Sequence, residues 1–237
     1  EKINLISLSK KMIAIICVCI CSVVLNNFLV KVSPFELNKE AEFGMSHYFM
    51  MGLNAENNGI WYESDVKFSE SFSTRKERTA QNIRVAKERI EDYGVDGLVK
   101  HIEKKTLTLF NDGSFAFGVE GDFYVAKAHL NNESIKTLQS IFLSDGELYI
   151  YSLTIRQFVW LFVLCVMLFS VFCRQTDCVT RVTLFSLAGI TLFELLFEAR
   201  ARYLFIYVPF FIILAAKGLE TLNFMFDNYR KNKLIKK

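Results

Sequence analysis

Four charged side chains, Glu194, Glu198, Arg200 and Arg202, lie between the last two apolar runs of the chain. A charge at membrane depth costs about 2.5–3.5 kcal/mol on insertion scales, so such a side chain usually faces protein, water or a ligand head group. The guanidinium group is planar and permanently charged, which suits two-pronged contacts to phosphate. We therefore expect Arg200 and Arg202, with Glu198 and Tyr203 beside them, to contact a lipid-linked phosphate at the outer membrane surface.

The spacing of these residues leaves an alternative open. Glu194, Glu198 and Arg202 are four residues apart, so they share one face if the turn is helical. In that case Glu198 can pair locally with Arg202, and the arginines can extend to lipid head groups without binding a specific ligand. Glu194 lies deeper in its apolar run and needs a partner inside the helix bundle.

The sequence contains no complete metal-binding or nucleotide-binding motif. A glycine-rich phosphate loop, a Walker signature, HExxH and CxxC are all missing from it. Its histidines, at positions 47, 101 and 129, do not have metal-ligand spacing. We expect no cofactor, although a divalent cation stays open because carboxylates alone can bind one.

Composition and charge indicate a membrane partner. Of 237 residues 52% are hydrophobic, and the net charge of +3 is too small to predict nucleic-acid binding. The basic residues lie mainly beside the apolar runs, as is typical of membrane proteins. All six cysteines lie in or at the ends of these runs, which excludes a disulfide framework in the polar part of the chain.

The apolar runs approach the roughly 20 residues that a helix needs to cross a bilayer. They predict a mainly α, polytopic integral membrane protein with about four transmembrane helices and a mostly helical extracellular segment. The expected domains are a first transmembrane helix with a basic lead at 1–31, an extracellular segment at 32–152, three transmembrane helices at 153–222 and a basic tail at 223–237.

The first run, over about 12–30, has a competing interpretation as a secretory signal peptide, because its continuous apolar core is short and follows lysines. No small-x-small cleavage site follows it, so we expect a retained helix. The later spans are expected at 154–173, 182–197 and 201–216, the last with Pro209 inside it.

Local signals organise the polar segment. Thr74 and Glu77 have capping-box spacing and Gly94 marks a helix end, which predicts a helix over 73–93. A second helix over about 95–110 has apolar residues opposite lysines, so it either lies on anionic lipid or packs on a neighbour. Alternation around Val66 and Phe68 predicts a short strand or an extended loop. Turns are expected at 112–113 and 120–121.

The positions of lysine and arginine near the span ends predict the orientation. Both termini and the 174–181 loop are expected on the cytoplasmic side of a plasma membrane, with residues 32–152 and the charged turn outside. The two arginines of that turn are the exception to the pattern. Such exceptions are where function is expected.

Several segments resemble the GT-C membrane glycosyltransferases of the ArnT/PMT-like, family-39-like group. ARYLFIYVPFFIILAAKGLE is similar to their closing segment, where an Arg-Tyr-Leu entry precedes an apolar run with a proline. HYFMMGLN, GIWYESDV and LFNDGSFAF resemble the extracellular region of Gram-positive bacterial members. The resemblance implies transfer of a sugar from a polyprenyl-phosphate carrier to a cell-envelope acceptor on the outer face.

The same resemblance implies that part of the enzyme is missing. The family's acidic catalytic residue lies in the first extracellular loop, and nothing here matches that loop, so the catalytic residue is unknown. Because the chain starts with Glu1, we expect the C-terminal half of such an enzyme or a truncated relative. Arg200 and Arg202 would contact the carrier phosphate, while His47, Asp112 and Glu120 are weaker candidates for the acceptor or sugar side.

Two functions therefore remain for the chain. The first is a membrane-embedded glycosyltransferase, or its C-terminal half, with a polyprenyl-phosphate-linked sugar, membrane lipids and a cell-envelope acceptor as partners. The second is a non-catalytic membrane protein whose extracellular segment binds a partner. The incomplete acid–base set favours the second, and the arginine pair favours the first.

Overall fold

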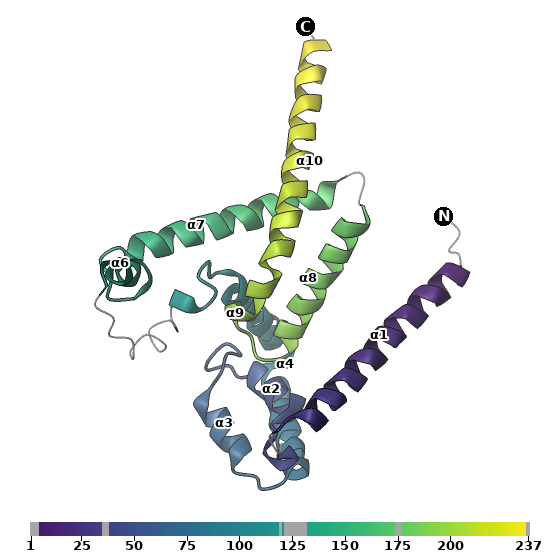
Figure 1. The fold of residues 1–237 in the computed structure, drawn as a ribbon, viewed down its shortest axis with the longest axis vertical. Coiled ribbons are helices and arrows are strands. Elements are labelled where there is room, and N and C mark those ends of the chain that lie inside the picture. The colour runs from purple at the N-terminus through teal and green to yellow at the C-terminus, as the bar shows by residue number, and fades with distance from the viewer. Residues whose placement is uncertain (1–4, 35–37, 119, 121–131, 174–176, 236–237) are drawn as a thin grey trace. The chain divides into compact units, whose positions relative to one another are not determined.

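The computed structural model describes residues 5–34, 38–118, 120, 132–173 and 177–235 (Figure 1). Regular structure in these residues is entirely helical, which confirms the expected mainly α class. The chain divides into a first unit, residues 1–42, and a second unit, residues 43–237. The elements in order are α1 Leu5–Val32, η1 Lys39–Ala41, α2 Gly44–Gly52, α3 Glu63–Glu70, α4 Arg75–Phe110, α6 Glu133–Phe142, α7 Tyr149–Leu168, η2 Phe169–Phe172, α8 Cys178–Leu196, α9 Ala201–Leu204, η3 Phe205–Tyr207 and α10 Val208–Ile235.

In the first unit, α1 confirms the helix expected over 12–30 and extends it at both ends. Its apolar portion runs from Ile16 to Val32. Most large apolar side chains along this portion are more than half exposed, Val24 and Phe28 among them. A helix that exposes apolar side chains on all sides is typical of contact with lipid.

Three helical stretches of the second unit are long and apolar enough to cross a membrane: Tyr149–Phe172, Cys178–Leu196 and Ala201–Lys233. They correspond to the second, third and fourth predicted spans. Phe158, Phe185 and Ile206 on these stretches expose 70%, 79% and 75% of their surface. In a bilayer such side chains contact lipid tails instead of water. The chain is therefore built to place these helices in a membrane.

The three stretches pack on one another through a small apolar core. Trp160 of α7, Leu187 of α8, and Phe211 and Leu214 of α10 form its buried centre. α10 crosses α7 and lies beside α8 in Figure 1. At the crossing, a Cβ atom on Gly218 would overlap the backbone of α7 at Val166, so glycine is what permits this close approach.

Pro209 does not interrupt a helix. The run expected as one span at 201–216 is divided into α9, η3 and α10, and Pro209 is the second residue of α10. A proline in the first turn removes an N–H that has no helical partner in any case. The short η3 segment before it joins the charged turn to the long final helix.

The polar segment of the second unit folds around α4. Thr74 caps α4 by accepting a hydrogen bond from the backbone N–H of Glu77 at 3.3 Å, and Gly94 interrupts the helix with φ 56°. Both local predictions, a helix over 73–93 and a second one to Phe110, are confirmed. Met50 of α2 and Ala86 of α4 form the buried contact between these elements.

The prediction of a strand or extended loop around Val66 and Phe68 is wrong, because residues 63–70 form the helix α3. Its buried positions are the polar residues Asp65 and Ser69, which are one helical turn apart. Asp65 bonds to Asn54 and Arg89, while Ser69 bonds to His47 and Asn82. A hydropathy pattern cannot reveal a helix whose inward face is polar. These hydrogen bonds and the ion pair stabilise α3.

Candidate functional site

The charged turn between α8 and α9 is extended and not helical. α8 ends at Leu196, and Phe197 and Arg200 have extended backbone conformations. The condition under which Glu194, Glu198 and Arg202 would share one helical face is therefore not met. Glu194 at the end of α8, Glu198 in the extended turn and Arg202 in α9 nevertheless line one cavity.

This cavity, which we call the α8–α9 cavity, has a volume of about 490 Å3. Its wall is mainly apolar and comes from α2, α8, the turn, α9 and η3. The apolar and aromatic lining consists of Met45, Tyr48, Ile190, Phe193, Phe197, Ile206 and Tyr207. The polar lining consists of Glu194, Glu198, Arg202 and Tyr203. An apolar pocket with a few convergent polar groups is the usual form of a small-ligand site.

Both arginines of the turn pair with Glu120, about 80 positions earlier in the chain. Arg200 Nη1 forms an ion pair with one carboxylate oxygen of Glu120, and Arg202 Nη1 donates to the other at 3.0 Å. Arg200 is the more buried, with 17% of its side chain exposed against 43% for Arg202. Arg202 lines the α8–α9 cavity, whereas Arg200 is not among its lining residues.

The two glutamates of the cavity are almost fully buried. Glu194 is 1% exposed and its Oε2 accepts a hydrogen bond from the backbone N–H of Arg200 at 3.3 Å. Glu198 is 6% exposed and its Oε2 accepts one from the hydroxyl of Tyr203 at 3.4 Å. Oε1 of Glu198 has no hydrogen-bond partner among the described residues, although Arg200 Nε lies 4.0 Å away. Burial raises the pKa of Glu198 above its ordinary value.

A buried lysine joins this turn to the polar segment. Lys105 is fully buried, and its Nζ donates hydrogen bonds to the carbonyl oxygens of Gly52, Leu195 and Phe197 at 2.9, 2.8 and 2.6 Å. Burial lowers the pKa of Lys105 to about 8. The sequence pattern groups Lys105 with Lys100 and Lys104 opposite the apolar residues of this helix, yet Lys105 is buried while the other two are exposed. No local signal distinguishes it from Lys104, because its partners are distant in sequence.

The turn and the polar segment are also joined by backbone. The N–H of Ala199 donates to the carbonyl of Gly59 at 2.8 Å, and a Cβ on Gly52 would overlap the backbone of Phe197. The polar segment and the α8–α9 turn therefore lie side by side. The arrangement is compatible with the predicted topology, and which side of the membrane both segments face stays a prediction.

Two other candidate residues lie away from the cavity and use their polar atoms internally. His47 is 1% exposed, stacks on Phe43 at 4.4 Å between ring centroids, and bonds through Nδ1 to Ser69 Oγ at 2.7 Å. Burial lowers the pKa of His47. Asp112 accepts hydrogen bonds from the backbone N–H groups of Ser114 and Ala116, as expected of a turn residue.

Among the described residues, no three His, Cys, Asp or Glu side chains converge in a way that could hold a metal ion. His129, Gly121 of the predicted 120–121 turn, and residues 174–176 of the predicted cytoplasmic loop lie outside the described residues. The six cysteines are free thiols.

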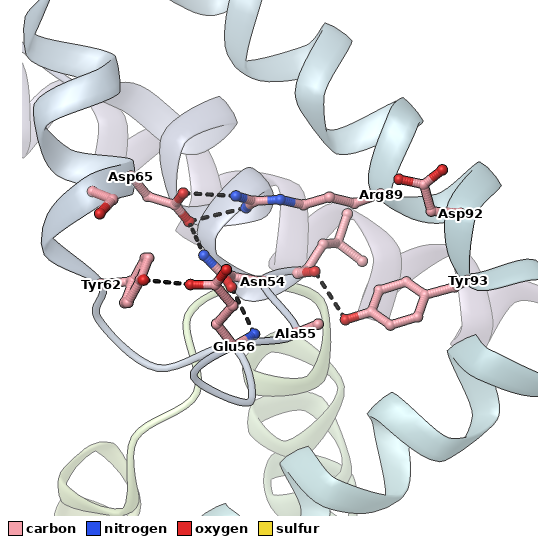
Figure 2. Close-up of a pocket in the computed structure, with 10 residues that line it drawn as sticks. Asn54, Ala55, Glu56, Tyr62, Asp65, Arg89, Asp92 and Tyr93 are labelled. Atoms are coloured by element: carbon pink, nitrogen blue, oxygen red, sulfur yellow. Dashed lines mark hydrogen bonds and ion pairs between the residues drawn. The ribbon is translucent and has the colours of Figure 1, made fainter.

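A second hollow of about 600 Å3, which sequence reasoning missed, lies in the polar segment (Figure 2). Asp65 and Arg89 face each other across two bonds, Oδ1 to Nη2 at 2.7 Å and Oδ2 to Nη1 at 2.9 Å. The Tyr62 hydroxyl donates to Glu56, and the Tyr93 hydroxyl donates to the carbonyl of Leu53 at 3.1 Å. These polar groups bond to one another, so they stabilise the fold of the polar segment, and we assign no ligand to this hollow.

A family model described as "conserved hypothetical integral membrane protein" matches residues 1–221. No curated protein and no solved structure matches the chain.

Proposed function

We propose that this chain, which belongs to the family of conserved hypothetical integral membrane proteins, binds a lipid-linked phosphate in the α8–α9 cavity. In this proposal the lipid is a polyprenyl phosphate that carries a sugar. The protein takes part in passing that sugar to a cell-envelope acceptor on the outer face of a bacterial plasma membrane. The observation that carries the proposal is a cavity in which an apolar wall and a cationic group, Arg202, meet at the end of membrane-type helices.

The apolar wall suits the hydrocarbon part of such a ligand. Ile190 and Phe193 of α8 and Ile206 of η3 line the cavity and belong to stretches apolar enough to cross a membrane. Ile206 and Phe193 are also 75% and 45% exposed, so the wall continues onto the outer surface of the helices. A lipid chain can enter the cavity from the side without leaving the apolar phase.

Arg202 suits the phosphate. A guanidinium group has five N–H donors. In the described structure Arg202 uses Nη1 for Glu120 and makes one long contact from Nη2 to the Tyr203 hydroxyl at 3.4 Å. The other donors of this half-exposed side chain are available for the oxygens of a phosphate. Arg200 pairs with the same carboxylate, Glu120, and is not among the lining residues of the cavity. We therefore assign the direct phosphate contact to Arg202.

A phosphate held in this way is also a leaving group. In transfer from a polyprenyl phosphate, the acceptor hydroxyl forms a bond to the anomeric carbon and the carbon–phosphate oxygen bond breaks. The electron pair leaves with the lipid phosphate, and a cationic side chain stabilises the charge that develops there. The acid–base residue that accepts the hydroxyl proton stays unassigned in this proposal.

The test measures binding to the full chain in lipid nanodiscs by native mass spectrometry, with decaprenyl phosphate and decaprenol as paired probes. Arg202→Ala should weaken decaprenyl phosphate binding about tenfold or more, because a hydrogen bond to a charged group contributes about 1.5–3 kcal/mol. Arg84→Ala is the matched control, since Arg84 is exposed and, among the described residues, bonds to Gln81 and Glu88 of its own helix. Equal affinity for the phosphate and the alcohol in the wild-type protein would refute the proposal.

Transfer is followed separately by the release of decaprenyl phosphate from a decaprenyl-phosphoryl hexose in the presence of cell-envelope fragments. This readout does not require knowledge of the acceptor. Arg202→Ala should lower the rate of release while the protein still reaches the membrane. An unchanged rate of release would show that Arg202 does not take part in the transfer.

A second candidate is binding of a partner by the polar segment, without catalysis. The specific observation in its favour is an exposed apolar stripe on the second half of α4. Val95, Val99 and Leu107 are 81%, 61% and 59% exposed. This candidate replaces the first if the full chain binds no polyprenyl phosphate, the wild-type chain captures an envelope protein, and Val99→Asp abolishes that capture.

A further inference from the structure

The short helix α6 has two faces of opposite character. Its apolar residues follow one another at helical spacing on one side, and they are Ile135, Leu138, Ile141 and Phe142. Leu138 and Phe142 are 53% and 39% exposed, so the fold of the described residues leaves much of this face uncovered. The other side carries the polar residues Glu133, Lys136, Thr137, Gln139 and Ser140. Such a helix is stable where its apolar face meets a second apolar phase.

A tight corner fixes α6 against the beginning of α7. The backbone N–H of Leu148 donates to the carbonyl of Ser140 at 2.9 Å. A Cβ on Gly146 would overlap the backbone of Ser140, so glycine permits the chain to turn back this closely. Across the corner, the guanidinium carbon of Arg156 lies 5.4 Å from the centre of the Phe142 ring, a cation–π contact. The two helices are in contact, and α6 is seen nearly end-on beside α7 in Figure 1, so they lie crosswise.

The beginning of α7 has the features of a membrane–water boundary. The stretch Tyr149–Phe172 is long and apolar enough to cross a membrane. In its first turn Ile150 and Tyr151 are 65% and 70% exposed. An exposed tyrosine at the end of a span is typical of the head-group level. A helix fixed crosswise to this end of a span lies along the membrane surface, where its apolar face continues the lipid-facing surface of the span.

We propose that α6 is an interfacial helix, which rests on the bilayer with Leu138 at the boundary between head groups and acyl chains. Helices of this kind bury their apolar face about 5–10 Å into that boundary. Because the corner joins α6 rigidly to α7, the helix also fixes the depth at which the span starts. The inference depends on α7 crossing the membrane and is independent of any ligand in the α8–α9 cavity.

The charges of this segment indicate which property of the bilayer α6 recognises. From Asn132 to Leu148 the chain has one basic residue, Lys136, against Glu133, Asp145 and Glu147. Lys136 forms an ion pair with Glu133 at 3.1 Å. A helix that binds anionic lipid carries an excess of lysine and arginine, which α6 lacks. The partner is therefore the apolar interior edge of the bilayer, and α6 should bind zwitterionic and anionic membranes alike.

The experiment places a nitroxide on each of three consecutive positions of α6 in the full chain, with the native cysteines replaced and the protein in phosphatidylcholine nanodiscs. The variants are Thr137→Cys, Leu138→Cys and Gln139→Cys. Accessibility to O2, which concentrates in the bilayer, is compared with accessibility to a water-soluble nickel chelate by power saturation. Successive helical residues point about 100° apart. Leu138→Cys should be several-fold more accessible to O2 than to nickel, and both neighbours should show the reverse order.

A second measurement tests whether the apolar face holds α6 on the membrane. The reporter is a nitroxide on Ser134→Cys, because Ser134 is exposed and lies one helical turn before Leu138 on the same side. Adding Leu138→Asp should lower the ratio of O2 to nickel accessibility at the reporter several-fold. Thr137→Asp, which adds the same charge to the polar side, is the matched control and should leave the ratio unchanged. Leu138→Phe keeps the face apolar and should also leave it unchanged.

Each other outcome overturns the inference in a distinct way. High nickel accessibility at all three scanned positions would place α6 in water. Low accessibility of Leu138→Cys to both reagents would show that protein, either a second copy or another partner, covers the apolar face. High O2 accessibility at all three positions would place the whole helix inside the bilayer. An O2 preference at Leu138→Cys that appears only with phosphatidylglycerol would replace apolar contact by charge attraction.

Discussion

Replacement of Lys105 by methionine tests how the polar segment holds the charged turn. Methionine has a similar length and no hydrogen-bond donor, so it removes the ammonium group while it keeps most of the packing. In the folded protein that group donates to the carbonyls of Gly52, Leu195 and Phe197 at 2.6–2.9 Å and is fully buried. The substitution therefore leaves carbonyl groups without a partner.

The size of the effect follows from the partners that remain. The carbonyl of Gly52 still accepts from His101 Nε2 at 2.9 Å. The carbonyls of Leu195 and Phe197 lie at the C-terminal end of α8, where no following helical N–H is available. Each buried unsatisfied carbonyl costs about 1–3 kcal/mol, so Lys105→Met should lower the free energy of unfolding by about 2–6 kcal/mol.

The same lysine predicts a pH dependence of definite sign. Burial lowers the pKa of Lys105 from 10.5 to about 8, so between these pH values the unfolded chain binds a proton that the folded chain has lost. The free energy of unfolding then rises with pH at this site, by up to about 3 kcal/mol. Below about pH 8 the site contributes no pH dependence. The stability difference between the wild-type protein and Lys105→Met should widen as the pH rises from 8 toward 10.5.

The assay is unfolding in mixed detergent micelles, followed by circular dichroism, at pH 7.5 and 9.5. Lys104→Met is the control, because Lys104 is an exposed neighbour on the same helix and should leave stability unchanged. A free energy of unfolding for Lys105→Met within about 0.5 kcal/mol of wild type would refute the reasoning, because changes that small are typical of exposed side chains without buried partners.

Two further results are expected. Arg89→Met leaves Asp65, which is 4% exposed, without its ion-pair partner and should cost about 3–5 kcal/mol of stability. Lys67→Met, which removes an exposed ion pair on α3, should cause no measurable change. Equal melting temperatures for the two variants would contradict this prediction. In a background without the native cysteines, an impermeant thiol reagent applied to intact cells should label Lys100→Cys and leave Asn232→Cys unlabelled, and the opposite pattern would reverse the predicted topology.

The sequence allowed prediction of the long apolar helices and of the start and interruption of α4, which depend on neighbours along the chain. Long apolar runs predicted the helices now described as α7, α8 and α10, because the length needed to cross a bilayer is a local property. Thr74 and Gly94 predicted the start and the interruption of α4 for the same reason. Four spans were expected, and three are long and apolar enough within the described residues, while Ile16–Val32 is a shorter apolar helix.

The features that the sequence could not predict depend on contacts between distant residues. Nothing near Lys105 shows that its ammonium group meets carbonyls about 90 positions away. Glu120 was a weak candidate for the sugar side, and its pairing with Arg200 and Arg202 is visible only in the fold. The proximity of Glu198, Arg202 and Tyr203 was expected. The extended backbone at Phe197 and Arg200 was not, because the four-residue spacing left the conformation of the turn open.

The central claim is that a lipid phosphate occupies the α8–α9 cavity, and site-directed photocrosslinking tests it most directly. A polyprenyl phosphate with a photoreactive group near the phosphate is incorporated with the full chain in nanodiscs, and labelled peptides are mapped by mass spectrometry. The account predicts labels concentrated on residues 190–207, reduced by excess unlabelled polyprenyl phosphate and by Arg202→Ala. Labels spread evenly over the exposed faces of α7 and α10, unchanged by either treatment, would contradict it.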